Sequence, residues 1–285
     1  NLEGGLGDQI IHARFASEIE KRNGKTILCS PKSLHGIFSR IPGVFKCITL
    51  EEIPITFHDY WIPGFSCSWI FGHDFNSLPN KPYIFCDQES SELWKYYLND
   101  ESNNKKPKIG IRWSGNPKFE HQQFRKFPEN FITNLAKYPE LELYSLQRDH
   151  NTIDLPEGIT DLQHFLISWE DTAAAIMNLD IVITSCTSIA HLAAGMGKET
   201  WVIVPILPYH TWTYKAPQST TSPYYDCITL FRQTTINEWN DPFQRLYAKL
   251  EDKFNLARIE QPNEDRTLKR LNLGCGNKKI KNFVN

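Results

Sequence analysis

The chain has 285 residues, of which 40% are hydrophobic and 22% are charged, and its formal net charge is −2. This composition is typical of a globular protein, and the length fits one large domain or two of ordinary size. A chain so close to neutrality has no overall field that attracts nucleic acid, so any anion site must be local. We therefore expect no nucleic-acid partner.

Hydropathy and cysteine usage indicate the cellular compartment in which the protein is expected. No apolar run reaches the ~18–20 residues that a membrane-spanning helix requires, and no signal peptide is visible. The seven cysteines form no CxxC pair, and several lie in strand-like stretches, which is typical of free thiols in a reducing compartment. The nine histidines and seven cysteines show no zinc-ligand spacing. We expect a cytoplasmic protein without a transmembrane segment or a metal site.

The first part of the chain alternates strand-like stretches with helical or loop segments. Strands are predicted for TILCS, KCITL, HDYWI and PYIFC, at 26–30, 46–50, 58–62 and 82–86. The segment 10–21 has the apolar periodicity of a helix. The polar stretch NDESNNKKPK, 99–108, has no apolar residue and predicts a linker.

The second part repeats this alternation more regularly. Strands are predicted within 108–112, 142–147, 180–184 and 199–205, and helices within 128–139, 168–179 and 188–197. Such alternation is typical of a parallel sheet covered by helices. The two parts together predict an α/β fold of two Rossmann-like domains facing a cleft. We place them at 1–104 and 105–254, followed by a separate segment at 255–285.

A glycine loop, GGLGD, stands near the start of the chain. Gly4, Gly5 and Gly7 let the backbone turn sharply and approach a ligand, and a helix follows whose free N–H groups favour a polar ligand. Asp8 can cap this helix or act as a general base in a cleft. From its spacing in the sequence alone, Asp8 is interpreted as the helix cap rather than the base.

The stretch TSCTSIAHLAAGMGK, 184–198, follows a buried strand and opens a helix of small residues. Ser185, Thr187 and Ser188 place hydroxyl donors at the helix N-terminus, which would suit a diphosphate. The alternative is a simple cap with tight helix packing, but three hydroxyls exceed what one cap needs. His191 lies one turn beyond Thr187 on the same helix face, although a lone histidine is more often structural.

A second polar turn follows the strand at 108–112. Ser114 and Asn116 supply donors there, and Arg125 and Lys126 come later, just before a helix. Two cations near a strand-end turn suit a phosphate, and the alternative is a solvated surface loop. The aromatic stretches at 205–217 and 222–233 could stack on a base or a sugar, but we favour core or loop anchors for most of them.

Several motifs occur in a characteristic order: WSGNP, RKFPENF, YSLQ, EDTAAAIMNLDIVIT, SCTSIAHLAAGMGK, WVIVP and SPYYDCITLFRQ. Together with GGLGDQI, this order resembles that of heptosyltransferase-like enzymes of glycosyltransferase family 9, and especially the variants linked to tetratricopeptide repeats. The resemblance covers roughly residues 1–250. It implies a GT-B fold, with the acceptor domain first and the nucleotide-sugar domain second. It also implies metal-independent, inverting sugar transfer.

The resemblance assigns roles to individual residues. Asp8 matches the general base, Lys126 matches a lysine that contacts the donor phosphate, and Thr187, Ser188 and His191 match the donor motif. The family usually has Asp where this chain has Cys186. The expected donor-binding set is Ser114, Asn116, Arg125, Lys126, Gln147, Ser185, Thr187, Ser188 and His191, with Asp8 catalytic and Gly4, Gly5 and Gly7 in the acceptor-side loop.

The last stretch, RLNLGCGNKKIKNFVN, resembles the first motif of S-adenosylmethionine-dependent methyltransferases. The whole sequence predicts a glycosyltransferase that moves a sugar from a nucleoside diphosphate to a hydroxyl of a glycan, lipid-linked or protein acceptor. The donor is a substrate, and no cofactor is expected. Two alternatives stay open: a silent sugar-nucleotide-binding module fused to a methyltransferase, and a sugar-nucleotide epimerase.

Overall fold

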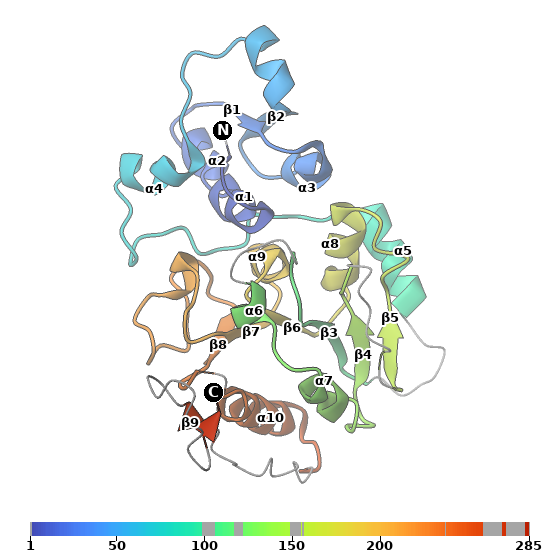
Figure 1. Ribbon diagram of the computed structural model, residues 1–285. Coiled ribbons are helices and arrows are strands. Elements are labelled where there is room, and N and C mark those ends of the chain that lie inside the picture. The colour runs from blue at the N-terminus through green and yellow to red at the C-terminus, as the bar shows by residue number, and fades with distance from the viewer. Residues whose placement is uncertain are drawn as a thin grey trace.

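The computed structural model describes residues 2–98, 106–116, 122–148, 155, 157–236 and 238–258, with the backbone of 270–271 and 283–284. Its main feature is a six-stranded parallel sheet in the order β5-β4-β3-β6-β7-β8 (Figure 1). The strands are β3 (Lys108–Arg112), β4 (Glu142–Ser145), β5 (Ile159–Asp161), β6 (Ile181–Ser185), β7 (Thr200–Val204) and β8 (Ile228–Arg232).

Helices cover both faces of this sheet. Val182 of β6 packs into one apolar core, while Ile181 and Ile183 pack into the other, because successive side chains of a strand point to opposite faces. One core contains residues of α8 (Trp169–Met177) and α9 (Ser188–Gly195), and the second contains residues of α7 (Asn130–Leu135) and α10 (Asn240–Phe254). Figure 1 shows these pairs on opposite sides of the sheet, with α5 (Gln88–Leu98) beside α8.

The N-terminal part has its own small sheet, in which β1 (Thr26–Cys29) pairs in parallel with β2 (Val44–Ile48). Its helices are α1 (Leu6–Ala13), α2 (Ala16–Glu20), α3 (His35–Phe38) and α4 (Cys67–Ile70), with 3₁₀ turns at Lys32–Leu34, Leu50–Ile55 and Gly64–Ser66. Within the described residues no sheet continues from one part of the chain into the other. One apolar core nevertheless includes residues of both parts.

Two of the predicted strands are wrong. Residues 58–62 have no regular structure, and Tyr60 and Trp61 are exposed rather than paired in a sheet. Residues 82–86 are also irregular, since the N–H groups of Tyr83 and Ile84 both donate to the carbonyl of Gly195. Pro82 has no backbone N–H to donate, and Pro63 follows directly after 58–62; proline in or beside a stretch disfavours strand pairing.

The helix predicted over 10–21 is also different. It begins at Leu6 and is broken between α1 and α2. The Arg14 Nε donates to the carbonyl of Ile11 at 2.8 Å, and the N–H of Phe15 bonds instead to the carbonyl of His12. The edge strands β5 and β8 and the helices α5 and α10 were not predicted.

The other predicted strands and helices of the second part are confirmed within a few residues of their bounds. The predicted boundary near 104 and most of 255–285 lie outside the described residues. Of the methyltransferase-like stretch, only β9 (Arg270–Leu271) and β10 (Phe283–Val284) are described, as a parallel pair. Among the helices that the structure describes, none has the length and apolar character needed to cross a membrane.

Candidate functional site

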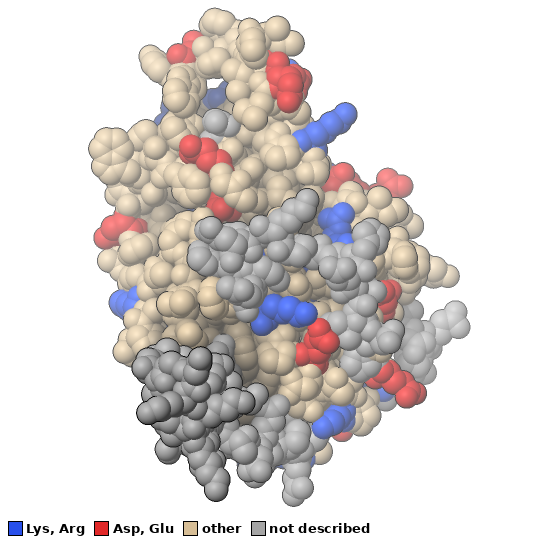
Figure 2. Space-filling model, viewed as in Figure 1, with Lys and Arg blue, Asp and Glu red and all other residues tan. Residues whose placement is uncertain are grey.

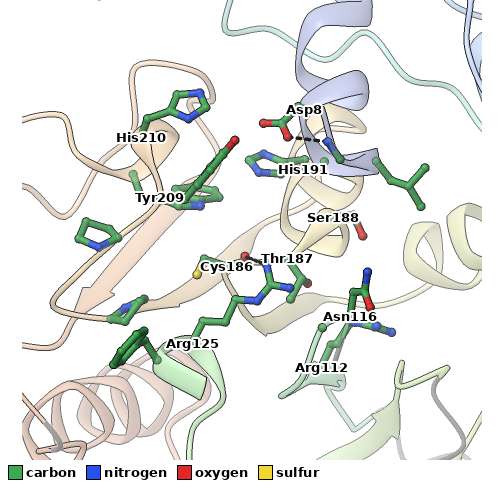
Figure 3. Close-up of a pocket in the computed structure, with 18 of the residues that line it drawn as sticks. Asp8, Arg112, Asn116, Arg125, Cys186, Thr187, Ser188, His191, Tyr209 and His210 are labelled. Carbon is green, nitrogen blue, oxygen red and sulfur yellow. Dashed lines mark hydrogen bonds between the residues drawn. The ribbon is translucent and has the colours of Figure 1, made fainter. Parts of the chain in front are cut away.

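A cavity of about 660 Å³ is lined by four segments that lie far apart in the sequence (Figure 3). They are the start of α1, the turn after β3 together with α6 (Gln122–Arg125), the junction of β6 and α9, and the loop after β7. The cavity therefore lies where α9 begins, at the carboxyl end of the parallel strands. This is the usual place for a ligand in an open α/β sheet.

Many of the residues singled out in the sequence line this cavity. They are Gly5, Gly7, Asp8, Asn116, Arg125, Thr187, Ser188 and His191. The packing of α1 against α9 brings the glycine loop and the hydroxyl-rich turn together. Gly7 allows this approach, because a Cβ there would lie 2.9 Å from Cδ2 of His191 and 3.5 Å from Cα of Ser188.

Other predicted residues lie near the cavity without lining it. Ser185 is fully buried, and the N–H of Ser114 donates to Oε1 of the buried Gln147 at 3.3 Å. Lys126 has a half-exposed side chain whose Nζ lies 3.1 Å from Oε1 of Glu129. Gly4 precedes the cavity and has a φ of +76°, a conformation that favours glycine.

Asp8 both caps α1 and faces the cavity. Its Oδ2 accepts a hydrogen bond of 2.9 Å from the N–H of Gly5. Gly4 folds closely over the carboxylate, since a Cβ on Gly4 would lie 2.7 Å from Oδ2. Burial raises the pKa of Asp8, while the Gly5 N–H and His210 act to lower it. A carboxylate with a raised pKa is a stronger proton acceptor, so the cap and the base are compatible roles.

The N-terminus of α9 faces the cavity from the opposite side. Thr187 is its N-cap residue, but its side chain makes no capping hydrogen bond among the described residues, and its Oγ1 lies 3.4 Å from Oγ1 of Thr184. The N–H groups of the first turn are thus not occupied by a side-chain cap. Together with the helix dipole, they favour an anionic ligand beside Ser188.

Two arginines line the same region. Nη1 of Arg125 donates to the carbonyl of Cys186 at 3.4 Å, and Nη1 of Arg112 donates to the carbonyl of Leu146 at 3.0 Å. Figure 3 shows both side chains near Thr187. Burial raises the pKa of the Cys186 thiol to about 11, so an uncharged group stands where the resemblance leads one to expect Asp. Cys186 therefore does not neutralise Arg125.

Arg112 was missed in the sequence, although its place at the last position of β3 is a usable signal. Strand ends in a parallel sheet are where ligand-binding side chains gather. Tyr209 and His210 were also missed, because the aromatic stretch around them was assigned to core and loop anchors. Both residues line the cavity, and His210 belongs to a short 3₁₀ turn, His210–Trp212.

His191 is held firmly at the cavity wall. Its Nδ1 lies 3.2 Å from the hydroxyl of Tyr225, and its ring stacks on Trp212 with the centroids 4.8 Å apart. Burial, followed by the charge of Arg14, lowers the pKa of His191 to about 3. The imidazole is therefore neutral at physiological pH, and it is both a structural residue and a cavity-lining one.

Arg14 connects distant segments behind the cavity. The side chain is fully buried, and Nη1 donates to the carbonyls of Pro79 and Tyr224 at 2.6 Å each. The guanidinium carbon lies 4.9 Å from the ring centroid of Tyr83 and 4.6 Å from that of Tyr225. Burial is the main cause that lowers the pKa of His12 and His191, and the charge of Arg14 acts in the same direction.

The described residues contain no group of three or more His, Cys, Asp or Glu side chains that could hold a metal ion. Among the polar groups that line the cavity are one carboxylate, two guanidinium groups and a helix N-terminus. This set favours an anionic ligand close to a proton acceptor.

No family model matches the chain, and no curated protein matches it in sequence. Solved structures share its fold, and two of them are described here. The E. coli ADP-heptose LPS heptosyltransferase II has a TM-score of 0.60 at 12% identity, over 89% of this chain and 97% of that one. The family 9 glycosyltransferase of Veillonella parvula has a TM-score of 0.57 at 11% identity. The match covers 89% of this chain and 90% of that one. The chain thus has the fold of these glycosyltransferases, as the resemblance predicted.

Proposed function

We propose that the protein is a glycosyltransferase that moves a sugar from a nucleoside-diphosphate sugar to a hydroxyl acceptor. One observation carries the proposal: a single cavity joins a carboxylate of raised pKa, Asp8, to an anion-binding end formed by the α9 N-terminus, Arg112 and Arg125. The fold that the chain shares with E. coli ADP-heptose LPS heptosyltransferase II supports the same activity.

The reaction follows from this arrangement. The acceptor oxygen attacks the anomeric carbon of the donor sugar while its proton passes to the carboxylate of Asp8. The bond between that carbon and the diphosphate oxygen breaks, and its electron pair stays on the diphosphate. The two guanidinium groups and the N–H groups of α9 stabilise the charge that develops on the leaving group.

Attack on the face opposite the leaving group inverts the anomeric carbon, so we propose an inverting single displacement. We also propose that the reaction needs neither a metal nor a further cofactor, because arginines and a helix N-terminus can balance the diphosphate charge. In this reading residues 1–104 form the acceptor side and residues 105–254 the donor side of a GT-B cleft. A cytoplasmic location is proposed because all described cysteines are free.

The test is a thermal-shift screen with UDP-, GDP-, ADP- and CMP-sugars, followed by measurement of donor hydrolysis and transfer. A ligand that binds only the folded protein raises the apparent melting temperature, by an amount set by its concentration relative to Kd. We expect a rise with one class of donor, and release of the nucleoside diphosphate without added metal. Binding of a donor without any turnover would contradict the proposed glycosyltransferase activity and would favour a silent sugar-nucleotide-binding module.

A further inference from the structure

The cavity-lining His191 has a buried partner behind the cavity wall. Its Nδ1 lies 3.2 Å from the phenol oxygen of Tyr225, which is 2% exposed and does not line the cavity. A hydrogen bond between these atoms has two possible directions: the phenol O–H donates to Nδ1, or an Nδ1–H donates to the phenol oxygen. The direction decides which nitrogen of the neutral imidazole carries the ring hydrogen.

The neighbouring Tyr83 indicates the direction. Its phenol donates its own hydrogen to the carbonyl of Ile10 at 2.8 Å, so it can only accept from Tyr225. The two phenol oxygens lie 3.5 Å apart, which is long for an O–H···O hydrogen bond, usually about 2.5–3.0 Å. At 3.2 Å, Nδ1 of His191 is the nearer acceptor for the hydrogen of Tyr225. The distances therefore favour donation from Tyr225 to His191.

The buried charge of Arg14 favours the same direction. Its guanidinium carbon lies 4.6 Å from the ring centroid of Tyr225. The Lys and Arg side chains that Figure 2 shows are scattered over the surface, where water and salt screen them, whereas Arg14 is fully buried. A cation beside a phenol makes the O–H a stronger donor and the oxygen a weaker acceptor. Burial nevertheless raises the pKa of Tyr225 well above its ordinary value, so the phenol keeps the hydrogen that it donates.

The other ring nitrogen of His191 faces the cavity. Its Cδ2–Nε2 edge is turned toward the start of α1, since a Cβ on Gly7 would lie 2.9 Å from Cδ2 and 3.6 Å from Nε2. Gly7 lines the cavity, and Figure 3 shows His191 in the same part of it as Asp8 and Ser188. Among the described residues, Tyr225 is the hydrogen-bond partner of the imidazole, at Nδ1. When Nδ1 accepts from Tyr225, the ring hydrogen is on Nε2 and is available to a ligand.

We propose that Tyr225 is a positioning residue: it fixes the His191 tautomer that carries hydrogen on Nε2, and this N–H donates to an oxygen of the bound nucleotide sugar between Asp8 and Ser188. In the other tautomer a nitrogen lone pair would face that oxygen and repel it. A neutral donor also suits the site, because an imidazolium beside Asp8 would lower the basicity of the carboxylate. The inference rests on the proposed function, since it names a contact with the substrate.

The tautomer can be measured without any ligand, by ¹⁵N NMR of the full chain labelled at its histidines. Protonated and unprotonated ring nitrogens give well-separated signals, and the His191→Gln variant identifies those of His191. The test variant is Tyr225→Phe, which keeps the ring beside Arg14 and removes the hydroxyl. Tyr224→Phe is the matched control, because the ring of Tyr224 lies 5.5 Å from the same guanidinium carbon but its hydroxyl is not bonded to His191.

At neutral pH the wild-type protein and Tyr224→Phe should both show a protonated Nε2 and an unprotonated Nδ1. In Tyr225→Phe the Nδ1 signal should move toward that of a ring nitrogen that accepts no hydrogen bond. A protonated Nδ1 in the wild-type protein, or an unchanged Nδ1 signal in Tyr225→Phe, would overturn the proposal. The wild-type spectrum decides the direction of the hydrogen bond even if Tyr225→Phe does not fold.

Turnover tests what this tautomer contributes to the reaction. Folded Tyr225→Phe should hydrolyse the UDP-, GDP- or ADP-sugar that the protein accepts with a kcat/KM lower by about tenfold, the scale of one neutral hydrogen bond. Tyr224→Phe should keep the wild-type kcat/KM. Equal values for Tyr225→Phe and the wild-type protein would overturn the positioning role. The expected NMR signals in a protein that hydrolyses none of these nucleotide sugars would instead contradict the proposed function alone.

Discussion

Gly7 of α1 and His191 of α9 lie in direct contact, so close that a methyl group on Gly7 would meet Cδ2 of the imidazole at 2.9 Å. His191 cannot withdraw easily, because Trp212 stacks on its ring and Tyr225 lies within hydrogen-bond distance of its Nδ1. This contact sets the distance between the Asp8 end of the cavity and the anion-binding end.

Gly7→Ala should therefore destabilise the protein by about 1–3 kcal/mol, the usual cost of overpacking, and reduce transfer by displacing α1. Urea unfolding and a transfer assay measure the two effects. Gly5→Ala is the matched control, because a Cβ there would lie 3.5 Å from Oδ2 of Asp8, an ordinary contact. Equal stability of the two variants would contradict the close packing of α1 on α9.

Asp8→Asn should separate catalysis from capping. Asn caps helices about as well as Asp, so the variant should stay folded and bind donor normally. It lacks the proton acceptor, and transfer should fall by ~100-fold or more. The measurements are donor binding by calorimetry and kcat with a saturating acceptor. Full activity in the folded variant would remove Asp8 from the chemistry.

Arg125→Ala should weaken binding of the free nucleoside diphosphate by ~1.5–3 kcal/mol, the scale of a hydrogen bond to a charged group. Arg125 lines the cavity, whereas Lys126 pairs with Glu129 outside it. Lys126→Ala, which the family resemblance also places at the phosphate, should have a clearly smaller effect. Equal losses would mean that Lys126 enters the cavity when the nucleotide binds.

The pH dependence of transfer should report the environment of Asp8. Burial raises the pKa of Asp8, and His210 acts to lower it. Activity should rise with pH as Asp8 loses its proton, with an apparent pKa of kcat/KM above the ordinary value for Asp. His210→Gln removes the charge that lowers the pKa of Asp8. The rise of activity on the acidic side of the pH profile, its acid limb, should therefore move to higher pH. An acid limb that does not move would show that His210 does not act on Asp8.

Stability should decrease in mild acid because two buried histidines resist protonation. Burial lowers the pKa of His12 to about 4 and that of His191 to about 3. In the unfolded chain both titrate near 6.5 and take up protons first. Their contribution is complete above that value and is lost as the pH falls towards 4 and 3, at about 1.4 kcal/mol per pH unit for each histidine.

Urea unfolding between pH 7.5 and 5 measures this loss. The variants His12→Gln and His191→Gln should each make the dependence shallower, because each removes one group that gains a proton only on unfolding. His58→Gln is the control, since His58 is exposed. A dependence as steep in both buried-site variants as in the wild-type protein would contradict the pKa values of these two groups.

Local patterns were sufficient for much of the second part. The apolar run before Thr184 predicted β6, and the small residues after Ser188 predicted α9. Both predictions depend on the hydrophobic pattern of residues that are neighbours in the sequence. The same reasoning failed at 58–62 and 82–86. There, apolar residues resemble those of a strand, yet one segment is left exposed and the other bonds to the end of α9.

The sequence by itself determined the α/β alternation, the glycine loop and the hydroxyl-rich helix start, since all three depend on residues close in the chain. Only the tertiary structure decided that Asp8 and Thr187 line one cavity, that Arg112 and His210 join them, and that Lys126 turns to Glu129. The physical reason is that these relationships depend on how α1 packs on α9 and on which strand ends meet. Those contacts join residues that are far apart in the chain, so the periodicity of a local stretch does not predict them.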